Sequence, residues 1–138
     1  MMSPSVQFNI GEILWVDLPQ RIPPGHEQLG RRPVIVVGIP QLVQPVPYRM
    51  FLVVPLTRTR FQGPLFPLIP ADIGGLPADS TALIYQVGAI DARRVVGSLG
   101  NLSSAEMAPI WTGLRLMFGF REDVEYDNDQ DNDTIEVS

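Results

Sequence analysis

Short apolar stretches follow one another along most of the chain, and glycine- and proline-rich segments separate them. Some stretches alternate apolar with polar residues and others are continuously apolar, as in strands buried on one face or on both faces. Strands are predicted at residues 12–17, 33–38, 51–56, 65–69, 81–85, 88–91 and 95–99. Because proline cannot donate a hydrogen bond within a sheet, Pro55 is expected at a strand end, an edge or a bulge. Many short strands with turn-rich connections are typical of a small barrel or a sandwich.

A helical pattern follows the last predicted strand. Apolar residues recur there at a spacing of three or four positions: Met107, Ile110, Trp111, Leu114 and Phe118. Ser103 and Glu106 have the spacing of a capping box at the start, and Gly119 is a typical stop at the end. Pro109 lies past the first turn, where it removes a backbone hydrogen bond, so a kink or a later regular start is expected. The apolar stripe is interpreted as packing against the core.

The 138 residues suit one domain, but their charge is unevenly distributed. The formal net charge is −5, yet residues 122–138 contain eight of the 15 acidic residues and no basic residue. Residues 1–121 therefore carry a net charge of +3, and all ten of their basic residues are arginines. High charge with little to bury predicts a disordered acidic tail at 122–138, so residues 1–121 are predicted to form the folded domain.

No segment has the pattern of a targeting or membrane-spanning sequence. The N-terminus, MMSPSVQFNIGEI, lacks a basic region followed by an apolar run, and no apolar run approaches membrane-spanning length. The expected location is therefore the cytoplasm, without membrane contact. Cysteine is absent, which excludes disulfides and thiolate metal sites.

The sequence contains few groups that support familiar catalytic or metal chemistry. His26 is the only histidine, and no nucleophile-elbow, phosphate-loop, dinucleotide-binding or zinc-protease motif occurs. The acidic residues before position 122 are scattered, so no metal and no other cofactor is expected. RNA suits such a protein because its own 2′-hydroxyl is the nucleophile. The protein then has only to orient that group, stabilise charge on the phosphorane and assist proton transfer, which arginines and a hydroxyl can do.

Five segments, in order and with sensible spacing, carry a resemblance to a known family. They are GEILWVD at 11–17, GHEQLGRRP at 25–33, VPLT at 54–57, LPADS at 76–80 with Gln86 and Asp91 beyond it, and GSLGNLS at 97–103. In these motifs the chain resembles the MazF/PemK family of type II toxins over roughly residues 10–120. The resemblance implies a mainly β fold with a C-terminal helix, an SH3-like small β-barrel of the CcdB/Kid/MazF type, for residues 1–121.

The resemblance also implies an activity. The family forms homodimers and cleaves single-stranded mRNA at short specific sequences without a metal, leaving a 2′,3′-cyclic phosphate and a 5′-hydroxyl. A cognate MazE-like antitoxin neutralises such toxins. Two other functions stay open on the same fold: a regulator that binds RNA or antitoxin without cutting, and a gyrase poison like CcdB. A gyrase poison would need no arginine–threonine active site.

By motif position, three residues match functional positions of the family. Arg32, the arginine before Pro33, matches its catalytic arginine and is expected to offset phosphorane charge and to give a proton to the leaving 5′-oxygen. Thr57 matches its catalytic threonine and is expected to hydrogen-bond the scissile phosphate. Glu27 matches a glutamate tied to activity, which serves as a base or orients Arg32. Contacts to RNA are expected from Gln28, Arg31, Arg58, Arg60 and Gln86.

Three of the expected RNA contacts have a structural alternative. Arg58 and Arg60 either follow the RNA backbone or belong to an ordinary exposed loop. Gln86 either touches a base edge or satisfies a buried backbone group. The loops at 40–49 and 62–64 are the candidates for base recognition.

Four further residues are interpreted structurally. Trp15 and Trp111 are expected to pack in the core or in a dimer interface. Asp79 and Ser80 are interpreted as a turn cap, because short polar side chains hydrogen-bond nearby backbone in turns.

Overall fold

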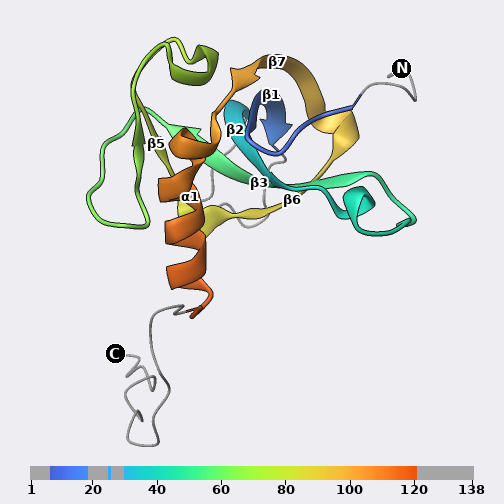
Figure 1. Ribbon diagram of the computed structural model, residues 1–138. Helices are drawn as coiled ribbons and strands as arrows, with labels where there is room; N and C mark the ends of the chain where they lie inside the picture. Colours follow the sequence, from blue (N-terminus) through green and yellow to red (C-terminus); the bar gives the residue numbers. More distant parts are fainter. Residues whose placement is uncertain (1–6, 19–24, 26–29, 121–138) are drawn as a thin grey trace, which may run out of the picture.

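The computed structural model of the chain describes residues 7–18, 25 and 30–120 (Figure 1). These residues form β1 (Glu12–Leu18), β2 (Gly30–Gly38), β3 (Met50–Thr57), β4 (Leu68–Ile69), β5 (Ser80–Ala82), β6 (Gly88–Asp91), β7 (Val95–Asn101) and α1 (Ser104–Met117). Short 3₁₀ turns connect them: η1 (Pro40–Leu42), η2 (Ile73–Gly75), η3 (Ile84–Gln86) and η4 (Ala92–Arg94). The predicted acidic tail and the residues His26, Glu27 and Gln28 lie outside the described residues.

Each of the seven predicted strands has a counterpart in the structure. β1, β2, β3 and β7 extend past their predicted bounds, and β6 matches its prediction. β4 and β5 are shorter than predicted. The segment predicted as one strand at 81–85 ends its pairing at Ala82, because the chain then turns into η3.

The strands form a curled antiparallel sheet in the order β4–β5–β3–β2–β1–β7, and β6 also pairs with β3 (Figure 1). One edge of β3 pairs with β2, while its other edge pairs with β6 at residues 50–53 and with β5 at residues 56–57. Pro55 lies where this second edge changes partner, and its carbonyl accepts a hydrogen bond from the Leu83 amide there. Because both backbone polar atoms of a strand residue point to the same edge, the missing N–H of Pro55 removes no bond to β2. The result is a half-barrel with a C-terminal helix, which confirms the predicted fold class.

Both faces of the central strands are buried. Alternate residues on one face pack with α1: Ile13, Ile35, Val54 and Leu56 from the strands, and Met107, Ile110 and Leu114 from the helix. The residues between them face a second cluster: Leu14, Val16, Val34, Val36, Phe51 and Val53, with Ile90 and Ala92 beyond. This double burial explains why these strands are almost continuously apolar in sequence.

Helix α1 has the predicted boundaries. The Ser103 hydroxyl accepts from the Glu106 amide, and the Glu106 carboxylate accepts from the Ser103 amide, so the capping box is formed. Of the two consequences expected of Pro109, a kink or a later regular start, the later start is wrong, because the helix starts at Ser104 and continues through Pro109. At its end, Gly119 adopts a φ of 82°, and the amide of Phe120 donates to the Arg115 carbonyl, which is the glycine stop predicted. Within the described ranges, no helix is long and apolar enough to cross a membrane.

Candidate functional site

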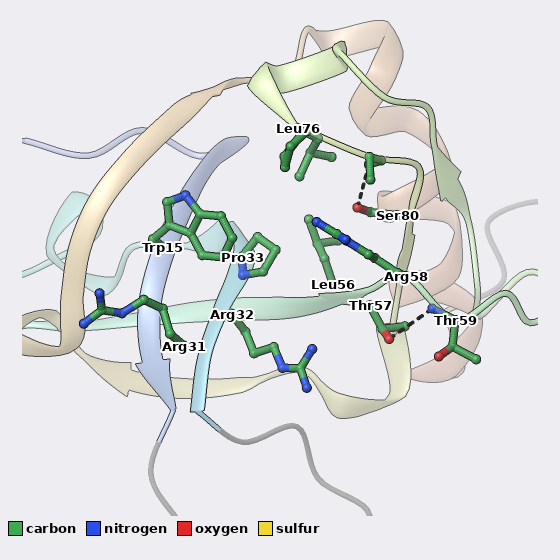
Figure 2. A pocket seen from close by; sticks show the side chains of 12 residues that line it. Trp15, Arg31, Arg32, Pro33, Leu56, Thr57, Arg58, Thr59, Leu76 and Ser80 are labelled. Atoms are coloured by element: carbon green, nitrogen blue, oxygen red, sulfur yellow. Dashed lines mark hydrogen bonds between the residues drawn. The ribbon is translucent and has the colours of Figure 1, made fainter.

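A cavity of about 470 Å³ opens where β2 begins and β3 ends (Figure 2). Its polar lining consists of three arginines and three hydroxyl side chains: Arg31, Arg32, Arg58, Thr57, Thr59 and Ser80. The rest of the lining is apolar: Trp15, Pro33, Leu56, Leu76, Pro77 and Ala78. The described lining contains no acidic side chain, so the cavity sets concentrated positive charge beside hydroxyl groups. Such a lining favours a ligand that is anionic and accepts hydrogen bonds.

The pairing of β2 with β3 brings Arg32 and Thr57 together. Val34 lies opposite Pro55 in this antiparallel pair, and the same register extended by two residues sets Arg32 opposite Thr57. Directly opposed residues on adjacent strands project their side chains from the same face, with Cβ atoms about 5 Å apart. Figure 2 shows the Arg32 side chain extending toward the end of β3 that carries Thr57. The two residues predicted to be catalytic and described by the structure therefore line one cavity.

The hydroxyl of Thr57 is held by the backbone just beyond it. Its Oγ1 accepts a hydrogen bond from the amide of Thr59 at 3.3 Å. A hydroxyl has one hydrogen to donate in addition to the lone pairs with which it accepts. The bond from Thr59 therefore fixes the position of the Thr57 oxygen and leaves its hydrogen for an acceptor in the cavity.

Two further arginines extend the positive surface around this pair. Arg31 lies on β2, and its Nε donates to Asp17 Oδ1 at 3.1 Å across the β1–β2 pair. The two side chains are 64% and 50% exposed, so water screens this ion pair and a phosphate can compete with Asp17 for the guanidinium. Arg58 follows directly on Thr57 and forms no ion pair with another described residue. Both arginines thus line the cavity, and their contacts to a phosphate backbone stay a prediction.

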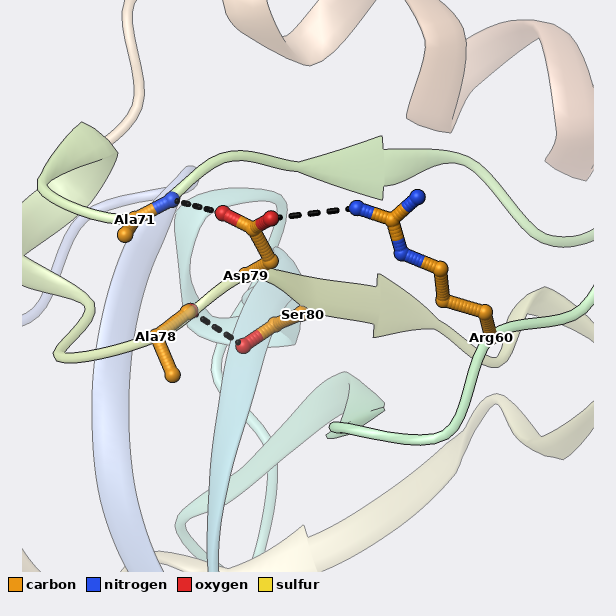
Figure 3. Close-up of polar contacts among 5 residues, drawn as sticks. All are labelled: Arg60, Ala71, Ala78, Asp79 and Ser80. Atoms are coloured by element: carbon orange, nitrogen blue, oxygen red, sulfur yellow. Dashed lines mark hydrogen bonds and ion pairs between the residues drawn. The ribbon is translucent and has the colours of Figure 1, made fainter.

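Arg60 is exposed and does not line the cavity, so its predicted contact to RNA stays a prediction. Its Nη2 donates to Asp79 Oδ2 at 3.1 Å, and the amide of Ala71 donates to Asp79 Oδ1 at 2.8 Å (Figure 3). The hydrogen bond from the Ala71 amide, with a smaller effect of Arg60, holds the pKa of the Asp79 carboxyl below its usual range. Next to it, Ser80 Oγ donates to the Ala78 carbonyl at 3.0 Å. Asp79 therefore ties the loop after β3 to the segment whose residues Ala78 and Ser80 form the cavity wall.

Gln86 also lies outside the cavity. It sits in η3, half-buried, and its Nε2 donates to the Tyr85 hydroxyl at 3.1 Å. Of the predicted RNA contacts, Arg31 and Arg58 thus line the cavity, whereas Arg60 and Gln86 do not. Gln28 and the predicted catalytic Glu27 lie outside the described residues.

The sequence did not predict that Trp15 lines the cavity. Trp15 was expected to pack in the core or at a dimer interface, but it is only half-buried and lines the cavity. The sequence could have indicated this position only through the pairing of β1 with β2. In that pair Trp15 lies opposite Pro33, the neighbour of Arg32. Trp111 is half-buried against the α1 side of the core, as expected.

Among the residues that the structure describes, no group of three or more histidine, cysteine or acidic side chains is arranged to hold a metal ion.

The sequence matches a family model over residues 9–118. That family is described as PemK-like, MazF-like toxin of type II toxin-antitoxin system. The matched segment contains all seven strands and α1 of the described chain, as well as every residue that lines the cavity.

Solved structures with the same fold include MazF proteins and an endoribonuclease. MazF from Deinococcus radiodurans is 25% identical, with a TM-score of 0.62 over 80% of this chain and 96% of that one. An endoribonuclease from a mycobacterial species, solved in complex with its cognate antitoxin, is 20% identical, with a TM-score of 0.61 over 80% of this chain and 94% of that one. A MazE–MazF complex from Deinococcus radiodurans is 22% identical, with a TM-score of 0.59 over 82% and 96%. These matches confirm the predicted barrel type.

Proposed function

Because the chain belongs to the family of PemK-like and MazF-like toxins of type II toxin–antitoxin systems, we propose that it is an endoribonuclease whose active site is the cavity where β2 begins and β3 ends. The substrate is single-stranded RNA, cut at a short specific sequence. The reaction needs no metal or other cofactor, since the 2′-hydroxyl of the RNA is the nucleophile. Solved relatives described as endoribonucleases support this proposal.

The observation that carries the proposal is the pairing of Arg32 with Thr57 in one cationic cavity. A phosphate bound there receives the Thr57 hydroxyl hydrogen on one oxygen and the forked N–H groups of Arg32 on others. The negative charge on those oxygens grows as the phosphorus becomes five-coordinate. Fixed donors aimed at growing charge lower the barrier more than they lower the energy of the bound substrate.

The reaction conserves atoms and protons in a simple way. The 2′-oxygen loses its proton and bonds to phosphorus, while the bond from phosphorus to the 5′-oxygen of the next nucleotide breaks. The products are a 2′,3′-cyclic phosphate and a 5′-hydroxyl. Arg32 supplies the proton to the leaving 5′-oxygen. The 2′-hydroxyl proton goes to Glu27 or, where Glu27 only orients Arg32, to water, and exchange with water then returns Arg32 and Glu27 to their starting protonation states.

Arg31 and Arg58 hold the RNA backbone on either side of the reacting phosphate in this proposal. Both line the cavity, and the exposed Arg31–Asp17 pair exchanges Asp17 for a phosphate at small cost. Every phosphate contact of this kind releases counterions from the RNA, so binding weakens as salt rises.

The proposed partners are a cognate MazE-like antitoxin and a second copy of the chain. Two solved relatives are complexes of a toxin with its antitoxin. We further propose that residues 1–121 form the toxin domain and that the acidic residues 122–138 lie outside it. The proposed location is the cytoplasm.

Cleavage of a long single-stranded RNA in EDTA tests the proposed function. Purified protein, free of antitoxin, is compared with Arg32→Ala and with Arg94→Ala, which removes an exposed arginine that does not line the cavity. We expect specific cuts with 2′,3′-cyclic phosphate ends from the wild type and from Arg94→Ala, and a loss of at least roughly 10²-fold in rate for Arg32→Ala. Absence of cutting by a folded protein that still binds RNA would instead indicate the non-cutting regulator.

A further inference from the structure

We propose that Phe61 and Tyr85 form a stacking surface for a base of the RNA, one nucleotide away from the phosphate in the cavity. The proposal rests on the proposed function, which makes single-stranded RNA the ligand. It adds a second subsite to the cationic cavity and assigns it to residues outside every motif in which the chain resembles its family.

Three aromatic rings lie in a continuous row, and the first of them, Phe61, follows two residues after the cavity residue Thr59. The centroids of Phe61 and Phe66 are 5.0 Å apart, and those of Phe66 and Tyr85 are 5.7 Å apart. The backbone beside Phe66 and Tyr85 is joined, because the Ile84 amide donates to the Leu65 carbonyl. Phe66 therefore supports the two outer rings in place.

The outer rings are open to solvent. Phe61 is 47% exposed and Tyr85 is 50% exposed, while Phe66 between them is half-buried. A core role requires burial, and the row lies outside both buried clusters of the described residues. Rings that are already ordered lose little conformational entropy when a flat ligand stacks on them.

The row is continuous with the cavity along the chain. Thr59 lines the cavity and Phe61 follows two residues later, a separation of at most about 7 Å along the backbone. The Arg60–Asp79 ion pair, whose carboxylate also accepts from the Ala71 amide, lies between the intervening turn and the segment that forms the cavity wall. A nucleotide next to the reacting phosphate therefore lies within reach of the Phe61 ring.

The charge beside the row favours nucleic acid over an apolar partner. The segment from residue 58 to residue 67 contains two arginines, two phenylalanines and no acidic residue. Aromatic rings interleaved with cations are the features by which proteins bind single strands, because every base has a face that stacks. Gln86, whose amide nitrogen donates to the Tyr85 hydroxyl, lies beside a base stacked on that ring. This position gives Gln86 the base-edge contact that sequence analysis predicted for it.

The test measures binding of single-stranded oligonucleotides to the full chain. The probes are random-sequence 2′-deoxy dodecamers, which lack the nucleophile and stay uncut, with 2-aminopurine at one fixed position. Stacking quenches 2-aminopurine fluorescence, so quenching by the wild type and not by Phe61→Leu reports the ring itself. Phe61→Trp is the rescue variant, and Phe120→Ala removes another exposed aromatic ring as the matched control.

We expect Phe61→Leu and Tyr85→Leu each to weaken binding about 5- to 100-fold, which corresponds to the usual range for one stacked base. Phe61→Trp and Phe120→Ala should bind like the wild type. If the wild type cuts RNA and Phe61→Leu retains both the quenching and the affinity, the stacking surface is overturned. The proposed nuclease activity then stands. Quenching lost in Phe61→Leu in a protein that never cuts supports the stacking surface and overturns the nuclease. If Phe61→Leu and Tyr85→Leu change the oligomeric state of the protein and leave the quenching of 2-aminopurine unchanged, the row belongs to a protein interface. That result overturns the proposal.

Discussion

Arg32 and Thr57 lie opposite each other across the β2–β3 pair and line the same cavity, although 24 other residues separate them in the chain. Strand pairing brings them together, since the register that sets Val34 opposite Pro55, extended by two residues, sets Arg32 opposite Thr57. Neither residue depends on a flexible loop for its position, because both belong to strands with buried central residues. A site built on paired strands is held within narrow limits, which is what a transition state requires.

Replacing the Thr57 hydroxyl tests its role as a donor to the phosphate. Thr57→Val keeps the shape of the side chain and removes the hydrogen, so we expect the single-turnover cleavage rate to fall roughly 10²- to 10³-fold. Thr57→Ser keeps the hydroxyl and should stay within about tenfold of the wild type. Equal rates for Thr57→Val and Thr57→Ser would assign Thr57 a purely structural role.

Arg58 and Arg60 are two positions apart in sequence but have different environments, which salt dependence can separate. Arg58 lines the cavity, whereas Arg60 is bound to Asp79. We expect Arg58→Gln to reduce the slope of log affinity against log salt by about 0.7, the value for one phosphate contact on a single strand. Arg60→Gln should leave the slope unchanged. Titrations of an uncut 2′-deoxy oligonucleotide at several salt concentrations measure both slopes, and a reversed order would show that Arg60 leaves Asp79 to bind RNA.

The Asp79 bridge predicts a specific pH dependence of stability. The pKa of Asp79 is lowered in the folded state, so its carboxylate stabilises the fold above the ordinary pKa of aspartate and loses this effect as the pH falls through the lowered value. The difference in urea midpoint between the wild type and Asp79→Asn should therefore be constant from about pH 5 to 8 and shrink below about pH 4. A difference that persists unchanged at about pH 2 would mean that Asp79 acts without its charge.

The predictable part of this fold was the part with a regular apolar pattern. All seven strands and the two ends of α1 follow from alternation, apolar runs and the capping residues Ser103, Glu106 and Gly119. The place of Pro55 inside β3 was harder to predict. A strand interior can accept proline where one edge of the strand changes its partner, here from β6 to β5, and the sequence does not show such a change. Pro109 is exposed on α1, and the continuous helix there shows that packing of the opposite face outweighs the lost hydrogen bond.

The candidate site was only partly predictable, and the reason is the dependence of contacts on tertiary structure. Motif positions identified Arg32 and Thr57, and the two residues line one cavity. Nothing in the local sequence shows that Asp79 binds Arg60 across 19 positions, or that Trp15 reaches the cavity through its pairing with Pro33. The loop at 40–49, a candidate for base recognition, contributes no residue to the cavity lining, so its role stays a prediction.

Gly113 has a structural requirement that reverses the usual effect of alanine in a helix. A Cβ at this position would lie 2.7 Å from the Pro64 carbonyl oxygen and 3.0 Å from Ile84 Cγ1, so α1 approaches its neighbours where no side chain intervenes. Alanine normally stabilises a helix by up to about 1 kcal/mol over glycine. We expect Gly113→Ala to lower the free energy of unfolding by about 1–3 kcal/mol through overpacking.

Urea unfolding measures this effect, with Thr112→Ala on the exposed side of the same helix as the control. The control should be neutral or slightly stabilising, because alanine has the higher helix propensity. A stabilised Gly113→Ala variant would mean that the segment around Pro64 moves away from α1 without cost.

The chemistry of the Arg32–Thr57 cavity is tested most directly by one oligoribonucleotide pair in EDTA. Both carry the sequence at which the protein cuts, and one has a single 2′-deoxy nucleotide on the 5′ side of the cut phosphate. We predict that the all-ribose strand is cleaved to a 2′,3′-cyclic phosphate and that the 2′-deoxy strand stays intact and still binds. Cleavage of the 2′-deoxy strand at the same phosphate would contradict attack by the RNA's own hydroxyl, and with it the central claim for this site.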